Sequence, residues 1–123
     1  MEKQTLLLTG AIIGGLAVAI GAFGAHALKP FLIEAGREDT FELAVRYQFY
    51  HALALLATGF ALNENRKSLH YSGLFFLLGI IFFSGSLYVL CLTGLTVLGA
   101  VTPIGGTFLI LGWILLGIGV YKK

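Results

Sequence analysis

The sequence predicts an all-α integral membrane protein, a four-helix bundle that forms a single domain over residues 1–123. The composition is the first observation: 58% of the residues are apolar, 11% are charged, and the mean hydropathy is +0.92, whereas soluble proteins carry about 25% charged residues. Four long apolar stretches are the second, each close to the ~20 residues that cross a bilayer. None alternates like a barrel strand, so helices are expected, because backbone polar groups in lipid must be paired internally.

We expect membrane helices at about residues 5–28, 40–62, 69–93 and 103–121, and a short interfacial segment at about 30–37. The first helix follows Lys3 and runs into Ala25-His26-Ala27, which resembles a signal-peptide cleavage site. The apolar run is longer than a signal core and three further spans follow it, so the helix is expected to be retained. Pro30 either ends it or opens the interfacial segment, whose mixture of apolar and charged residues suits the headgroup layer. Asp39 is expected to cap the second helix, with Glu42 completing a capping box.

The first helix carries a face of small residues. Gly10, Gly14, Ala17, Gly21 and Gly24 recur at steps of three and four residues, which places them on one side of the helix. Small residues let helix backbones approach closely in a membrane. Because a second row of small residues lies beside this one, we expect the first helix to be central and the most buried.

The charges predict the orientation. Four spans place both termini and the second loop on one side, and that side carries Lys3, Arg66, Lys67, Lys122 and Lys123. The cations of the other side are offset by acidic residues. The positive-inside rule therefore places both termini in the cytoplasm of a protein of the plasma membrane. The net charge of +2 and the lack of a long basic run argue against a nucleic-acid partner.

The densest polar stretch inside an apolar segment is 46–51, in the second helix. At 100° per residue, Glu42 and Arg46 share an outward face, where they pair as i and i+4 and either anchor the protein or lie at a subunit boundary. Gln48 and His51 lie on the opposite face and are expected to point into the bundle. Ionisable groups at such depth are costly and usually have a structural or functional role.

Counting 1.5 Å per residue gathers polar groups from the helices in the half of the bundle away from the termini. The candidates for this polar core are His26, Gln48, His51, Ser84, Ser86 and Tyr88. The other half, apart from Thr9 and Thr58, is expected to hold almost only apolar residues and glycine. Trp113 falls mid-helix, too deep for an interfacial belt, so its indole N–H is expected to find a partner inside the bundle.

Four motifs together resemble a known family. They are Gly21–His26, Arg46–Leu53, Ser84–Tyr88 and the stretch from Thr102-Pro103 to Gly112-Trp113. In this order and combination they resemble the domain-of-unknown-function family 423, small bacterial integral membrane proteins similar to the eukaryotic transmembrane protein 256. The resemblance covers nearly the whole chain. It implies a four-helix membrane protein with no defined activity, and a role in envelope integrity as suggested for some members.

Three kinds of function follow from the polar residues. The favoured one is a non-enzymatic structural role without a cofactor, in which polar side chains hydrogen-bond across helices at about 0.6 kcal/mol each. An oligomeric channel or transporter for small solutes or protons is the alternative, since histidines relay protons.

The third hypothesis is a lipid-binding, metal-binding or catalytic protein. His26 and His51, without a cysteine pair or an inward carboxylate, are a poor metal-ligand set, and no catalytic motif is present. We therefore expect no catalytic residue and no metal ligand. The expected partners are membrane lipid and further copies of the chain, packed through glycine-rich faces or the face of Arg46.

Overall fold

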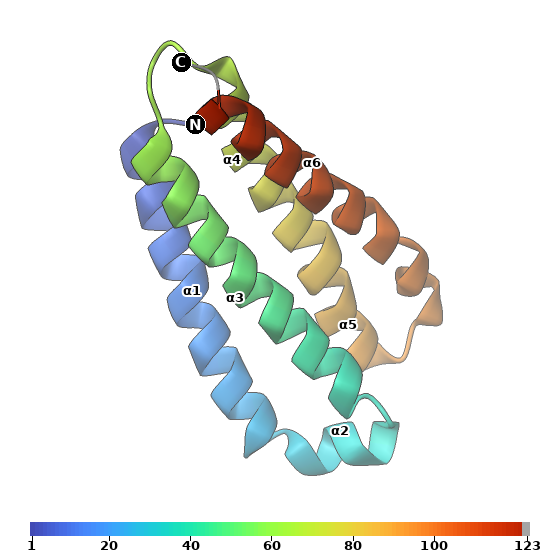
Figure 1. Cartoon of the computed structure of the whole chain (residues 1–123). Helices are drawn as coiled ribbons and strands as arrows, with labels where there is room; N and C mark the ends of the chain where they lie inside the picture. Colours follow the sequence, from blue (N-terminus) through green and yellow to red (C-terminus); the bar gives the residue numbers. More distant parts are fainter. Residues whose placement is uncertain (122–123) are drawn as a thin grey trace.

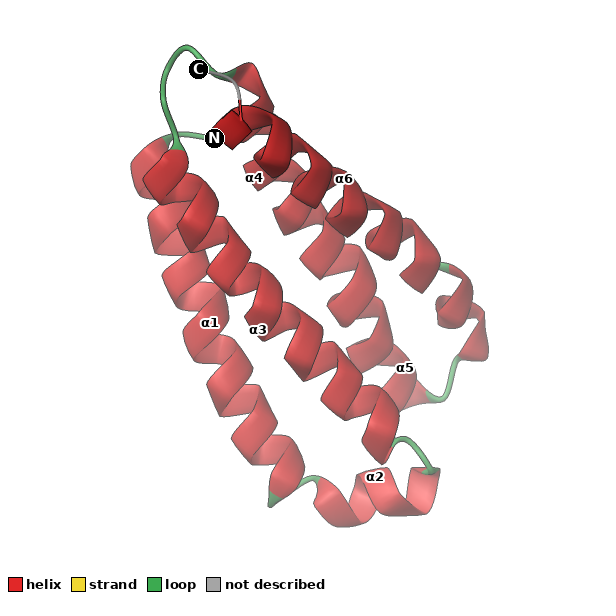
Figure 2. Cartoon of the chain, in the orientation of Figure 1, coloured by secondary structure: helices red, strands yellow, loops and turns green. Residues whose placement is uncertain are grey.

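A computed structural model describes residues 1–121 and shows helices joined by short turns, without a strand in that part of the chain (Figure 2). The helices are α1 (Lys3–Ala25), α2 (Lys29–Ala35), α3 (Glu38–Ala61), α4 (Lys67–Ile80), the π-helix η1 (Ile81–Gly85), α5 (Ser86–Thr93), the 3₁₀ helix η2 (Thr96–Ala100) and α6 (Thr102–Tyr121). Because α4, η1 and α5 are continuous, the long elements are α1, α3, the α4–η1–α5 rod and α6 (Figure 1).

Three of the long elements are long and apolar enough to cross a membrane: Lys3–Ala25, Lys67–Thr93 and Thr96–Tyr121, with mean hydropathies of 2.3, 2.3 and 2.0. The remaining long helix, α3, has 24 residues and a length of about 36 Å. Four of its first nine residues are charged, which lowers its hydropathy. All four of these charges lie near the end that follows α2.

The predicted capping box at the start of α3 is wrong. The helix begins at Glu38 with Arg37 as its N-cap residue, and no side chain caps it. Asp39 therefore lies inside the first turn, where a negative charge still interacts favourably with the helix dipole. The preceding turn is set by Gly36, whose φ of 68° ends α2 in the left-handed conformation that glycine adopts readily.

The first helix is not central, which corrects the expectation from its small residues. Only Leu6, Gly10, Ala17 and Gly24 are buried in α1, whereas nine residues are buried in α3. The glycine face packs against one neighbour only, with Gly10 beside Leu56 and Gly24 beside Phe41 of α3. The second row of small residues stays open, and the central helices are α3 and the α4–η1–α5 rod, each of which packs against several others.

A second close-packed pair is formed by α4–η1 and α6. A Cβ atom added to Gly105 would overlap the backbone of Phe82 and Phe83, and one on Gly112 would overlap the ring of Phe76. Glycine therefore lets α6 lie directly on the π-helical segment and on α4. The largest fully buried side chain of the core, Phe76, is held in this interface.

Candidate functional site

The centre of the polar layer is Gln48, which is 5% exposed and joins three helices. Its Nε2 donates to the carbonyl oxygen of Ile13 in α1 at 3.0 Å. Its Oε1 accepts from the hydroxyl of Tyr88 in α5 at 2.6 Å. A single amide on α3 therefore links α1 and α5 through both of its polar atoms.

The two predicted serines face opposite sides of the α4–η1–α5 rod. Ser84, in the π-helix, donates to the carbonyl oxygen of Ala44 in α3 at 2.7 Å. Ser86 donates to the carbonyl of Phe83 and lies 2.8 Å from the hydroxyl of Thr102 in α6. Residues two apart on a helix point in nearly opposite directions, and both serines are buried because the rod lies between α3 and α6. The α4–η1–α5 rod thus carries polar links to both neighbours.

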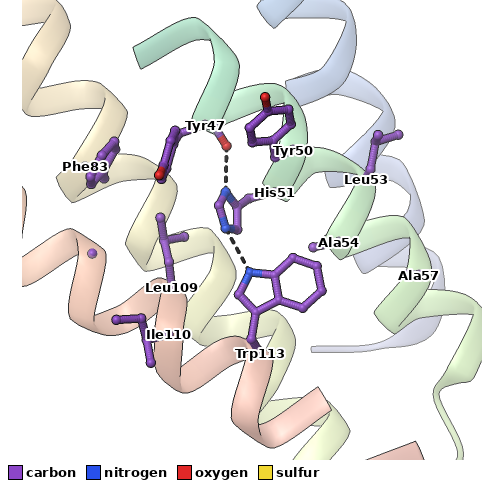
Figure 3. Close-up of a pocket in the computed structure, with 11 residues that line it drawn as sticks. Tyr47, Tyr50, His51, Leu53, Ala54, Ala57, Phe83, Leu109, Ile110 and Trp113 are labelled. Atoms are coloured by element: carbon purple, nitrogen blue, oxygen red, sulfur yellow. Dashed lines mark hydrogen bonds between the residues drawn. The ribbon is translucent and has the colours of Figure 1, made fainter. Parts of the chain in front are cut away.

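His51 is bonded at both ring nitrogens (Figure 3). Its Nδ1 lies 2.7 Å from the carbonyl oxygen of Tyr47, and its Nε2 lies 3.0 Å from the indole Nε1 of Trp113. A carbonyl only accepts and an indole N–H only donates, so the imidazole is neutral with its proton on Nδ1. The prediction that Trp113 finds a partner inside the bundle is confirmed.

His26 lies outside this layer, contrary to prediction. The first helix ends at Ala25 instead of about residue 28, and His26 is its C-cap residue, with φ −124° and ψ −85°. The chain turns there and the side chain is exposed. His26 and His51 consequently do not meet, and no group of three His, Cys, Asp or Glu side chains suited to a metal occurs within residues 1–121.

Glu42 and Arg46 lie on the outward face, as their helical angle implies. The nearest charged atoms are 3.9 Å apart, and the two side chains are 59% and 54% exposed. An exposed pair of this kind contributes roughly 0–1 kcal/mol to stability.

Polar links also occur at the end of the molecule that holds the termini, which sequence reasoning expected to be almost entirely apolar. Ser72 is fully buried in α4 and donates to the carbonyl of Gly112 in α6 at 2.8 Å. Arg66 donates to the carbonyl of Gly119 at 2.9 Å. The signal for Ser72 was its seven-residue spacing from Gly79, which places both on the face that meets α6.

The helices α3 and α6 have little contact with each other, and a cavity of about 810 Å³ lies between them. Its lining includes Tyr50, Leu53 and Ala57 of α3, Phe83 of η1, and Ile110 and Trp113 of α6 (Figure 3). The hydrogen bond between His51 and Trp113 joins two of the lining residues. Sequence reasoning missed this cavity, because helical angles give the face of a residue and not the separation of two helices.

The chain matches the model of a family described as "Protein of unknown function (DUF423)" over residues 20–106. The chain belongs to the DUF423 family. It is 43% identical to the UPF0382 membrane protein SSP2132 of Staphylococcus saprophyticus, over 97% of this chain and 98% of the relative. It is also 36% identical to the UPF0382 membrane protein YwdK of Bacillus subtilis (97% and 98% covered) and 38% identical to the UPF0382 inner membrane protein YgdD of Escherichia coli (99% and 93%).

These relatives and the apolar helices identify the chain as a membrane protein of an uncharacterised family. No solved structure matches the chain.

Proposed function

We propose that this DUF423 protein has a non-enzymatic, structural role as a four-helix bundle in the plasma membrane, where it supports the integrity of the membrane or envelope. The proposal rests on the polar layer, in which the buried polar groups are completely hydrogen-bonded. Among the described residues, every buried side-chain nitrogen or oxygen has a hydrogen-bond partner. Several of these bonds cross between helices, as at Gln48, Ser84 and His51.

Complete hydrogen bonding of the buried polar groups supports a structural layer over a conducting one. A proton path or a reaction centre needs polar groups that are free to exchange partners, whereas Gln48 and His51 are engaged at both ends by fixed protein groups. Interhelical hydrogen bonds in membranes average about 0.6 kcal/mol and reach roughly 1.7. Together, these bonds fix the axial position of each helix relative to its neighbours.

The proposed arrangement makes α3 the fourth membrane span. Its charges are confined to the end near α2, and α1 and α4 pack along it, which keeps it at their depth. The basic residues around the termini favour a cytoplasmic location for both ends. A cysteine placed at Glu34 should then react with an impermeant maleimide from outside the cell, and one placed at Glu64 should not.

Self-association is part of the proposal. Arg46 and Glu42 form an exposed pair on a face that otherwise meets lipid, and a second copy would cover it. Native mass spectrometry in mild detergent tests this directly. A spectrum that contains only the 13.2 kDa monomer would remove self-association from the proposal without affecting the structural role.

The decisive test of the structural role is Gln48→Leu. It removes the interhelical donor to the Ile13 carbonyl and leaves the Tyr88 hydroxyl without its acceptor, so we expect a loss of about 1–2 kcal/mol and a lower melting temperature in detergent. Gln4, which is exposed, gives the matched control Gln4→Leu, for which no change is expected.

The same variants distinguish a structural role from transport. Wild type and Gln48→Leu, reconstituted in proteoliposomes, should both be silent in assays of proton and small-solute flux. An unchanged melting temperature together with a flux that Gln48→Leu abolishes would replace the structural role with a transport role.

A further inference from the structure

The α3–α6 cavity differs in its walls from the helix interfaces around it. Tyr50 and Leu53 on one side, and Ile110 and Trp113 on the other, are 48%, 50%, 62% and 49% exposed. These large side chains hold a second helix at a distance, whereas the close helix pairs of this molecule meet through glycine. The walls are therefore poorly suited to a helical partner and leave space for a narrower molecule, such as a single extended hydrocarbon chain.

The side chains that line the cavity carry no charge, and their polar groups without a hydrogen bond among the described residues are the hydroxyls of Tyr47 and Tyr50. None of the residues that line it is Asp, Glu, Lys or Arg. His51 bonds the Trp113 N–H through Nε2 and the Tyr47 carbonyl through Nδ1, so the ring nitrogens of both residues are already hydrogen-bonded. An occupant that fits this surface is uncharged and apolar along the length that enters, because a charged group there would stay unpaired.

The length of the cavity matches that of one acyl chain in a bilayer. On α3 the lining runs from Tyr47 to Ala57, a length of about 15 Å along the helix. Half of a ~30 Å hydrocarbon core is the same length. The volume of about 810 Å³ lies within the roughly 300–1,000 Å³ of small-molecule sites. Under the membrane arrangement proposed above, on which this step rests, the cavity opens sideways into the hydrocarbon.

We infer that the α3–α6 cavity is a binding site for one acyl chain of a membrane phospholipid, held between Tyr50 and Leu53 on α3 and Ile110 and Trp113 on α6. The headgroup remains in the interface, and the chain contacts the Trp113 ring. This site is separate from the lipid that surrounds the whole protein, because it is a recess with its own walls.

Trp113 is the only tryptophan of the chain and lines this cavity, so tryptophan fluorescence reports contacts made there. The protein in detergent micelles is titrated with a phospholipid that carries brominated acyl chains, which quench tryptophan on contact. We expect quenching that saturates. Ala57→Phe fills the cavity from α3 and should raise the half-saturating mole fraction of lipid about tenfold. Ala11→Phe, at an exposed position of α1 away from the cavity, is the matched control and should behave as wild type.

A second variant tests the inference in case Ala57→Phe does not fold. Ile110→Ala removes part of an exposed wall, so it should fold normally and weaken lipid binding several-fold. Native mass spectrometry should show one phospholipid retained on wild type and on Ala11→Phe, and its loss from Ala57→Phe.

Two results would overturn the inference. Quenching that rises in proportion to lipid and is identical in Ala57→Phe would mean that only surrounding lipid touches Trp113. A dimer that Ala57→Phe converts to a monomer would mean that a second copy occupies the cavity. The outcome is independent of the structural role, since saturable quenching would persist even if Gln48→Leu left stability unchanged.

Discussion

Two kinds of helix contact occur in this molecule, and they are built from different residues. The pairs α1–α3 and α4–η1 with α6 are close, with Gly10 and Gly24 in the first and Gly105 and Gly112 in the second. The pair α3–α6 is open, and the hydrogen bond from Trp113 to His51 connects it. In lipid, small residues permit close packing of helices, and interhelical hydrogen bonds hold together helices that do not pack closely. The difference suggests that glycine carries most of the stability and that polar groups decide the alignment.

The largest effect should come from adding one methyl group to the closest contact. Gly105→Ala places a Cβ against the backbone of Phe82 and Phe83, which cannot move aside as a side chain end can. We expect a loss of about 3 kcal/mol or failure to accumulate in the membrane. Gly117→Ala meets nothing within 4 Å and should be neutral or slightly stabilising, since glycine weakens a helix. Thermal unfolding in detergent compares the two, and equal melting temperatures would refute a glycine-based contact.

The open pair should respond to loss of its polar bond, by less than the glycine variant. His51→Leu leaves the Trp113 N–H without its partner, and Trp113→Phe leaves His51 Nε2 without its donor, so each should cost about 1–2 kcal/mol. If the bond is what joins α3 to α6, the double variant should lose less than the sum, with a coupling of roughly 0.6–1.7 kcal/mol. Circular dichroism during heating measures all four proteins. Strict additivity would show that the two residues act separately.

Much of this comparison could be predicted from the sequence because helical geometry fixes which face a residue occupies. The angles of Gln48 and His51 on α3 were enough to expect two buried side chains, and the depth of Trp113 was enough to expect a partner for its indole N–H. The helix that a given face contacts cannot be predicted from helical angle and depth. The small residues of α1 predicted close packing, yet they contact only α3, so the expectation that α1 is central was wrong.

The same limit explains His26 and the α3–α6 cavity. His26 depends on where α1 ends, and helix boundaries shift by one or two residues without a strong cap. The cavity depends on the separation of two helices whose facing side chains, apart from His51, are apolar or aromatic, a composition equally compatible with a filled core. Only the assembled structure distinguishes these two outcomes.

A smaller effect is expected at Ser72, which adds a polar bond to a pair already packed through glycine. Ser72→Ala removes the donor to the Gly112 carbonyl and should cost about 0.5–1 kcal/mol. Ser68, one turn earlier, makes no side-chain hydrogen bond among the described residues, so Ser68→Ala is the matched control. The difference between their melting temperatures gives the value of the bond. A loss as large as that of Gly105→Ala would contradict the ranking of packing over polar bonds.

The smallest effect on stability is expected at the exposed pair, where neither glycine packing nor burial operates. Glu42 and Arg46 are 3.9 Å apart and more than half exposed, so Glu42→Gln should change the unfolding free energy by no more than about 0.5 kcal/mol. The variant separates two roles of this face. If Arg46 only anchors α3 near the headgroups, Glu42→Gln should leave the oligomeric state unchanged, because the cation remains.

If instead the pair lies between copies of the chain, Arg46→Gln should shift the mass distribution toward monomer while the melting temperature of the monomer stays the same. Lys29→Gln, which removes a cation from α2, is the control for a general effect of charge. If Arg46→Gln lowered the unfolding free energy by several kcal/mol, this face would be buried in an assembly. The face of α3 that carries Arg46 would then be a close contact, like the glycine-packed helix pairs.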